Sequence, residues 1–156
     1  MDSLGDALGD SISAQAGLLS ELLTELTEPI LVSAGLSRAN FDILTAIAGA
    51  RAGSQNEIAR RLGLAPASLS EALDRLVEAG WVLREANKRD GRAKRVRLTD
   101  RGVNLVRETV KAVQAGEQAA LASVARADAA IALRVLRTAN RALAEAVSAQ
   151  QKSSEN

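Results

Sequence analysis

The chain has 156 residues, of which 47% are hydrophobic and 25% are charged, and its formal net charge is +1. That length and apolar fraction are typical of one compact domain and argue against a disordered chain. The sequence contains no Cys and no His, which excludes disulfides, thiol redox sensing and zinc sites built from those ligands. Histidine is also the usual general base near neutral pH, so the composition disfavours an enzyme. We assign no catalytic residue, no metal site and no cofactor.

The first ten residues are acidic and lack the basic start and the apolar run of a signal peptide. No stretch approaches the roughly 18 consecutive apolar residues that a membrane-spanning helix needs. We therefore expect a cytoplasmic protein that does not bind membranes.

Charge is unevenly distributed along the chain. Residues 1–36 hold six acidic residues and no Lys or Arg, whereas seven basic residues fall between Arg84 and Arg97. A nearly neutral protein with one concentrated basic segment can focus positive potential on a single face.

Helical periodicity and turn residues define the first two elements. Apolar residues recur at helical spacing over 10–28, and Pro29 is expected to end or bend that helix. Gly35 provides a second break. Ser37 can cap a new helix, which Gly53 is expected to close.

Two short helices follow in close succession. Ser54 and Glu57 have the spacing of a capping box, and the helix they open is expected to stop at Gly63. Pro66 then stands where a first helical turn tolerates proline, and Gly80 ends this second helix. A tight connection between two short helices predicts a helix-turn-helix.

A β-hairpin is predicted after Gly80. Residues 81–83 and 96–98 are rich in β-formers, and Asp90-Gly91 between them is a turn signal within a long basic tip. Trp81 can be interpreted as a ligand-stacking residue or as a core aromatic, and we favour the core.

Two long helices complete the chain. Thr99 and Asp100 can cap the first, in which valines recur at a spacing of 3-4-3 residues; Asp128 can cap the second. Because such a seam needs an apolar partner, we expect the terminal helices to form a homodimer; the alternative is packing within the chain. The residues predicted to dimerise are Leu18, Leu22, Val103, Val106, Val110, Val113, Ile131, Val135, Leu143 and Val147.

The fold class predicted is therefore mainly α with a small β-hairpin. It is a winged helix-turn-helix at residues 37–101, flanked by dimerisation helices at residues 1–36 and 102–149. Residues 150–156 are polar and are expected to form a disordered tail.

A helix-turn-helix followed at once by a basic hairpin has a direct interpretation on DNA. The second helix enters the major groove with its N-terminal part nearest the base edges. The residues predicted to contact DNA there are Pro66, Ala67, Ser68, Ser70, Glu71 and Arg75. Ser68 and Ser70 could equally be ordinary surface residues. For Glu71 that alternative is favoured, because an acid near phosphates weakens binding unless it accepts a bond, for example from cytosine N4.

The hairpin carries the stronger signal. Clustered Lys and Arg are the expected electrostatic footprint of a nucleic-acid site, and a wing can contact phosphates or the adjacent minor groove. The wing residues predicted to bind DNA are Arg84, Lys88, Arg89, Asp90, Arg92, Lys94 and Arg95. Asp90 is the exception in sign, and its expected role is to pair with Arg92 or a neighbouring guanidinium and so stiffen the wing.

The segment from Asn56 to Gly102 holds a series of short motifs in a characteristic order. They are Glu57-Ile58-Ala59, Leu62-Gly63-Leu64, Asp74-Arg75-Leu76, Gly80-Trp81-Val82, Arg84, Asp90-x-Arg92, Leu98-Thr99 and Gly102. In these residues the segment resembles the signature region of the MarR-type transcriptional regulators. The Asp-x-Arg motif with Leu-Thr after it is the most specific of the matches.

The resemblance implies a homodimer whose terminal helices interleave and whose two winged modules each bind half of an inverted repeat in double-stranded DNA. It also implies that Arg92 enters the minor groove from the wing tip and that Asp90 orients the wing. Many relatives are released from DNA by a small-molecule effector; the few aromatics of this chain support that feature only weakly. Glu71 and Gly91 depart from the family pattern and bear on sequence preference and wing flexibility.

The function predicted from the sequence is a sequence-specific DNA-binding transcriptional regulator, acting as a repressor. The alternative is an architectural or anti-repressor protein that acts mainly through protein–protein contacts, with the acidic segment 1–36 as its interaction arm. Sequence-specific binding to an inverted repeat distinguishes the two.

Overall fold

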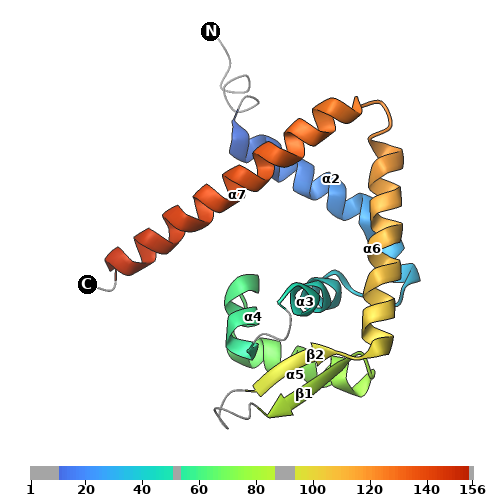
Figure 1. Ribbon diagram of the computed structural model, residues 1–156, viewed down its shortest axis with the longest axis vertical. Helices are drawn as coiled ribbons and strands as arrows, with labels where there is room; N and C mark the ends of the chain where they lie inside the picture. Colours follow the sequence, from blue (N-terminus) through green and yellow to red (C-terminus); the bar gives the residue numbers. More distant parts are fainter. Residues whose placement is uncertain (1–10, 51–53, 87–93, 155–156) are drawn as a thin grey trace. The chain divides into compact units, whose positions relative to one another are not determined.

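The computed structural model describes residues 11–50, 54–86 and 94–154 (Figure 1). These residues form helices and one hairpin in the order α2 (Ile12–Ser33), α3 (Arg38–Gly49), α4 (Gln55–Leu62), α5 (Pro66–Glu78), β1 (Val82–Ala86), β2 (Lys94–Leu98), α6 (Asp100–Ala120) and α7 (Arg126–Ser154). The chain divides into two compact units, residues 1–117 and 118–156. The mainly α class with a small hairpin is confirmed.

The two strands form an antiparallel pair in which Val82 faces Leu98 and Glu85 faces Arg95. Ser54, just before α4, makes an isolated antiparallel bridge to Arg95. Strand β2 is thus paired with β1 and is also joined to the start of the helix-turn-helix.

Most helix boundaries follow the predicted caps. The hydroxyl of Ser37 accepts from the amide of Asn40 at 3.2 Å, and that of Ser54 accepts from the amide of Glu57 at 3.3 Å. Gly63 has a φ of 65° and terminates α4 in the left-handed conformation that favours glycine.

Two boundaries in the N-terminal half differ from prediction. Pro29 lies inside α2, which continues to Ser33; the cost of the missing amide is offset because Thr27 and Leu31 on this last part of the helix are buried. Helix α3 ends at Gly49, before the predicted Gly53, which lies outside the described residues.

The C-terminal helix also differs. Helix α7 begins at Arg126, so Asp128 stands in its first turn, where a negative charge is favourable, and not at the cap. It continues to Ser154, so residues 150–154 are helical and not an irregular tail. This stretch contains no Gly or Pro that would stop the helix.

Every element of the first unit contributes to one core. Buried aliphatic side chains come from each helix and from both strands of this unit, among them Leu31, Leu44, Ile58, Leu73, Val82, Val96 and Val106. Phe41 is buried and Trp81 packs against the cluster, which confirms the core interpretation of Trp81.

The valine seam of α6 is largely used within the chain. Val106 is only 8% exposed, and Val110 and Val113 pack against the core of the first unit. A Cβ on Gly116 of α6 would stand 3.0 Å from Ile30 Cδ1 of α2, so these two helices are in contact. These three valines therefore have apolar contacts within the first unit, and their part in dimerisation stays a prediction.

No single helix among the described residues has the length and apolar composition needed to cross a membrane. Helices α2 and α3 meet those criteria only as a pair, and the chain bends by 87° between them.

The start of α6 fits tightly against the end of the helix-turn-helix. Thr99 accepts a bond from the amide of Gly102 at 2.9 Å and donates to the carbonyl of Gly80 at 2.8 Å. A Cβ on Gly102 would stand 2.1 Å from the Trp81 carbonyl oxygen. Only glycine allows this approach, which fixes α6 to Trp81, the residue just before β1.

We predict that Gly102→Ala lowers the free energy of unfolding by on the order of 3 kcal/mol, because backbone must move to admit the methyl group. Urea denaturation measures the change. Gly17→Ala is the matched control: its Cβ has no atom within 4 Å, so the same substitution in α2 should stabilise the protein by up to about 1 kcal/mol. Equal effects at the two positions would contradict the tight junction.

Candidate nucleic-acid interface

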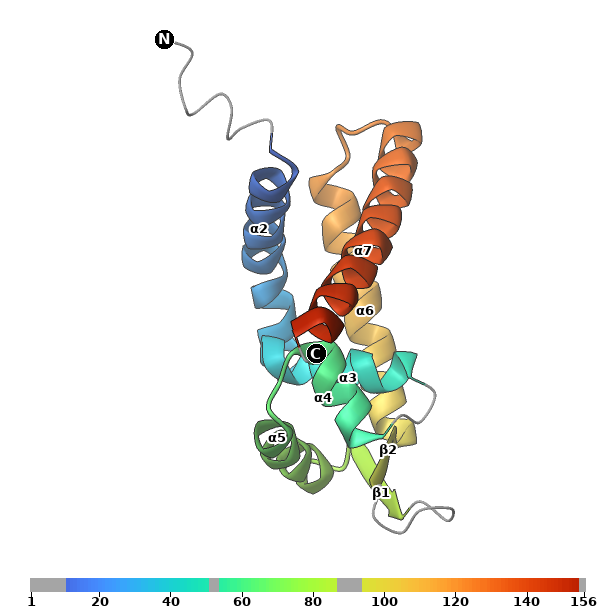
Figure 2. The same cartoon turned by 90° about the vertical axis from the view of Figure 1, so that its left-hand side faces the viewer.

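Helices α4 and α5 and the hairpin lie at one end of the first unit, and both views show α5 beside the strands (Figures 1 and 2). Helix α5 buries one face, formed by Leu69, Ala72, Leu73 and Leu76. Its opposite face is open to solvent. The buried face of α5 thereby sets which of its polar residues can meet another molecule.

Five of the six residues predicted on α5 are exposed. Pro66, Ala67 and Ser68 form its first turn, and Glu71 and Arg75 follow at four-residue intervals from Ala67. Ala67, Glu71 and Arg75 therefore lie along one side of the helix. Ser70 is half-buried and turns toward the hairpin.

Arg84, which is predicted to bind DNA from the wing, makes contacts to α5 within the protein. Its Nη2 donates to the Ser70 carbonyl at 2.9 Å and to the Ser70 hydroxyl at 3.3 Å, and its Nη1 pairs with Asp74. The Arg84 side chain is 22% exposed, against 63% for Asp74. Arg84 and Ser70 thus connect β1 to α5, and their side chains are occupied inside the protein.

This connection has a simple physical basis. A guanidinium offers five donors in a planar fork, so one side chain can bind a carbonyl, a hydroxyl and a carboxylate together. Arg84, Ser70 and Asp74 can all be read from the sequence, but Glu71 and Glu78 on the same helix are equally plausible partners for an arginine on the next strand. Only the packing of β1 against α5 selects Asp74.

The structure describes only some of the residues predicted to bind DNA from the wing. Arg95 is exposed on β2, and Lys94 pairs with Ala86 in the strand register. Arg97, which lies in the same basic run, forms an ion pair with Glu85 across the hairpin. The predicted residues Lys88, Arg89, Asp90 and Arg92 lie outside the described residues.

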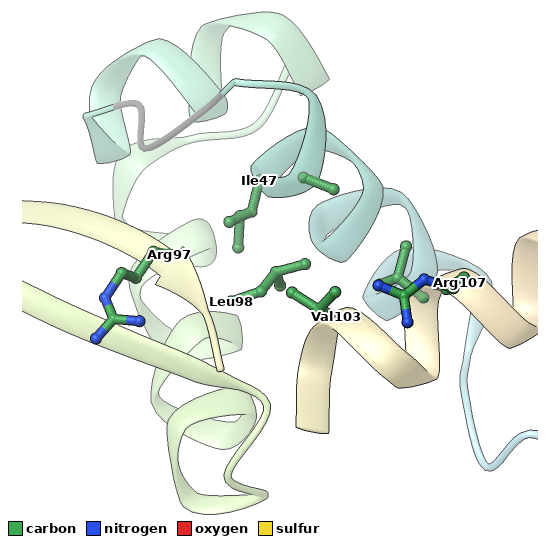
Figure 3. Close-up of a pocket in the computed structure, with 7 residues that line it drawn as sticks. Ile47, Arg97, Leu98, Val103 and Arg107 are labelled. Carbon is green, nitrogen blue, oxygen red and sulfur yellow. The ribbon is translucent and has the colours of Figure 1, made fainter. Parts of the chain in front are cut away.

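A hollow of about 470 Å³ lies where α3, β2 and α6 meet (Figure 3). It is lined by Ile47, Ala48, Arg97, Leu98, Val103, Val106 and Arg107. Sequence reasoning missed this feature because Ile47 and Ala48 of α3 lie about 50 residues before Arg97 and Leu98 of β2 and the start of α6. In the part of the chain that the structure describes, no group of three or more Asp or Glu residues could hold a metal.

We predict that Arg84→Met lowers the free energy of unfolding by on the order of 2 kcal/mol, since it removes a charged donor from the partly buried Ser70 carbonyl. Thermal and urea denaturation measure it. Arg97→Met is the matched control: its ion pair with Glu85 is half-exposed, so its loss should cost less than about 1 kcal/mol. A smaller loss for Arg84→Met than for the control would show that Arg84 does not connect β1 to α5.

Comparison with known proteins finds the same winged helix-turn-helix arrangement in other proteins. Residues 34–93 match the model of the MarR family, and this range contains α3 to α5, β1 and the residues between the strands. A mutant MarR from E. coli is 24% identical over 83% of this chain and 96% of its own, with a TM-score of 0.74.

Two further structures are similar. A mutant MarR from E. coli complexed with operator DNA is 23% identical over 88% of this chain and 99% of its own, with a TM-score of 0.71. The PcaV transcriptional regulator from Streptomyces coelicolor, in complex with its natural ligand, is 22% identical over 87% of this chain and 96% of its own, with a TM-score of 0.69. Residues 34–93 are thus similar to the MarR family model, and the chain shares the winged helix-turn-helix fold of these structures.

Proposed function

We propose that the chain is a sequence-specific transcriptional regulator, and not an enzyme, that binds double-stranded DNA as a homodimer in the cytoplasm. It acts as a repressor and is released by a small-molecule effector. The observation that carries the proposal is the exposed N-terminal face of α5, held in a fixed orientation beside the basic hairpin by Arg84.

On this proposal α5 lies in the major groove. Ala67 and Ser68 meet the base edges first, since the N-terminal residues of a recognition helix lie deepest. Glu71 and Arg75 extend the same side of the helix: Glu71 accepts from an exocyclic amine such as cytosine N4, and Arg75 binds guanine or a phosphate. Ser70 contributes by holding Arg84, so its effect on DNA binding is indirect.

The hairpin supplies the second contact. Lys88, Arg89, Lys94 and Arg95 bind phosphates, and Arg92 enters the minor groove, where the potential is strongly negative. Asp90 pairs with a neighbouring guanidinium and orients the wing. The run of basic residues from Arg84 to Arg97 in the sequence supports this part of the proposal.

Helix α7 supports the homodimer. Among its described side chains none is buried, and its apolar stripe of Ile131, Val135, Leu143 and Val147 is exposed, with Leu143 at 61%. A single helix gains most of its stability from packing an apolar face. We therefore propose that a second copy covers this stripe, together with Leu18, Leu22 and Val103, which are also exposed.

The similar structures support DNA and ligand binding. One is a mutant MarR complexed with operator DNA, and another is PcaV in complex with its natural ligand. The same fold in this chain makes both kinds of partner reasonable for it.

We predict that selection from a random DNA pool returns an inverted repeat with half-sites about 10 bp apart, because two recognition helices related by a two-fold axis read two-fold-related sequences. Sequencing of the bound pool and footprinting measure this. A pool without sequence preference would favour the architectural alternative, and a single half-site of equal affinity would contradict the dimer.

Two variants of α7 sharpen this test. Leu143→Glu places a charge in the proposed interface and should give a monomer in sedimentation and lose the preference for paired half-sites. Ser148→Glu adds the same charge on the polar side of the helix and should leave both properties unchanged. Equal behaviour of the two variants would place the interface elsewhere.

We predict that Arg92→Ala weakens operator binding by about 1–3 kcal/mol per site if its guanidinium makes a specific contact. A dimer on two half-sites would lose about two cationic contacts, so the log–log salt slope should fall by about 2. The free energy of unfolding should barely change, because Arg92 belongs to the proposed wing tip. Binding titrations at several salt concentrations measure both quantities.

Arg126→Ala is the control, since it also removes one arginine but at the first residue of α7. It should leave the salt slope and the affinity unchanged. Equal, small losses for both variants would show that Arg92 belongs to a solvated face only.

A further inference from the structure

Helices α2 and α3 meet at a sharp corner, where the chain bends by 87°. Of the side chains of α2, Thr27 and Leu31 near its C-terminal end are buried, whereas Leu18 and Leu22 nearer its start are exposed. Pro29 lies in the attached part and removes one hydrogen bond of the helix. Helix α2 is therefore attached through a short stretch with a weakened backbone, and the contacts at the corner set the direction of its exposed part.

The first residue of α3, Arg38, bridges this corner. Its Nη2 donates to the Thr27 hydroxyl, and that hydroxyl donates in turn to the Leu23 carbonyl of α2 at 2.7 Å. Thr27 is 2% exposed, and the buried Arg38 Nε has no hydrogen-bond partner among the described residues. A cation at the N-terminus of a helix also opposes the helix dipole. Arg38 therefore occupies an unfavourable position, for which its contact with α2 compensates.

The rest of α3 belongs to the winged module. Ile43, Leu44 and Ile47 are buried in the core, and α3 packs against α4 and β2. One turn after Arg38, Asp42 provides a counter-charge on the same helix: burial raises the pKa of its carboxyl, and the charge of Arg38 opposes that shift. Arg38 thus stands between a carboxyl group of the module and a hydroxyl group of α2.

Apolar and polar contacts hold the corner in different ways. The contact of Leu31 with the core and that of Ile30 with α6 near Gly116 keep the helices together, but apolar contact is non-directional and leaves small tilts open. A hydrogen bond, by contrast, weakens steeply when its angle departs from linear. The contact between Arg38 and Thr27 therefore restricts the tilt that the apolar contacts permit.

We propose that Arg38 is a positioning residue: by binding Thr27 it fixes the angle between α2 and the winged module, and thereby the separation of the two recognition helices in the dimer. The second part rests on the proposed function, in which another copy covers Leu18 and Leu22 of α2. Because α3 packs against α4 and β2, a tilt of α3 relative to α2 moves the module that carries α5. Two-fold symmetry repeats the tilt in the second copy, so the spacing of half-sites that the dimer fits depends on this corner.

The first test measures the corner in the full chain and needs no DNA. Because the sequence contains no Cys, Glu21→Cys on α2 and Glu78→Cys on α5 place spin labels at two exposed positions only. Dilution of labelled chains with unlabelled ones restricts the observed distances to those within one chain. Pulsed electron paramagnetic resonance should then give a narrow distribution of the distance between the labels.

Arg38→Met keeps an unbranched side chain but removes its donors, so in the labelled protein it should broaden or shift that distribution. Arg107→Met is the matched control: Arg107 donates to Asn104 of its own helix, so its loss removes an arginine without separating two elements, and the distribution should stay as it was. An unchanged distribution in Arg38→Met, or equal changes in both variants, would overturn the inference.

Variants of the acceptor test the same contact from α2. Thr27→Val removes the hydroxyl at nearly constant volume and should reproduce the effect of Arg38→Met, whereas Thr27→Ser keeps the hydroxyl and should keep the narrow distribution. The double variant of Arg38→Met and Thr27→Val should broaden it no further than either single one, since both remove one interaction. If Arg38→Met does not fold in urea denaturation, the comparison of Thr27→Val with Thr27→Ser decides alone, and equal distributions for these two would overturn the inference.

The consequence for DNA is measured on the operator selected from the random pool. Insertion of one base pair between the half-sites turns one against the other by about 35°. It should weaken binding of the wild type by at least about fivefold, near the lower end of the cost of one mismatched base pair. Arg38→Met should at least halve this ratio of Kd values and leave the Kd for an isolated half-site unchanged, and Arg107→Met should preserve the ratio.

The outcomes separate the two proposals. An unchanged ratio in Arg38→Met, despite a broadened distance distribution, would overturn the role of Arg38 in half-site spacing. Equal loss of affinity for the full operator and for the isolated half-site would mean that Arg38 acts only on the stability of the module, and would overturn it as well. Failure of the wild type to bind any specific DNA would overturn the proposed function, and the spin-label measurement would still decide whether Arg38 fixes the corner.

Discussion

The hairpin and α5 share one buried core, and the side chain of Arg84 joins them by polar contacts. From the middle of β1, Arg84 binds the Ser70 carbonyl, the Ser70 hydroxyl and the Asp74 carboxylate. A two-stranded hairpin is marginally stable alone, so its direction must be fixed by contacts to its neighbours. Together with the core that Leu73, Val82 and Val96 share, this connection holds α5 and the hairpin next to each other.

The same interaction adjusts the charge of the proposed recognition surface. Asp74 lies on the exposed part of α5, where an unpaired carboxylate would repel phosphates. Pairing with Arg84 offsets that charge, although it also removes one cation from the wing. Of the basic run, Arg84 and Arg97 are both engaged with acids inside the hairpin region. Arg95, by contrast, is exposed on β2.

The helices outside the winged module divide their apolar residues between two uses. The middle of α6 is committed to the core of the first unit through Val106, Val110 and Val113, and α2 joins that core through Leu31. Helix α7 keeps its stripe exposed along its length. If a second copy covers that stripe, the N-terminal unit would still hold its own core, and dimer formation and the folding of the winged module would be separable processes.

The sequence by itself determined the class of the fold, the positions of the caps at Ser37, Ser54 and Gly63, and the hairpin, because these depend on local periodicity and backbone preference. It also located the exposed side of α5 through the spacing of its leucines. Tertiary structure alone decided the partner of Arg84, the packing of the α6 valines against the core and the position of the hollow beside Arg107. Each of these depends on which distant residues meet in space. An arginine among several acids, or a valine seam that suits either a core or an interface, is decided by the packing of whole elements and not by spacing along the chain.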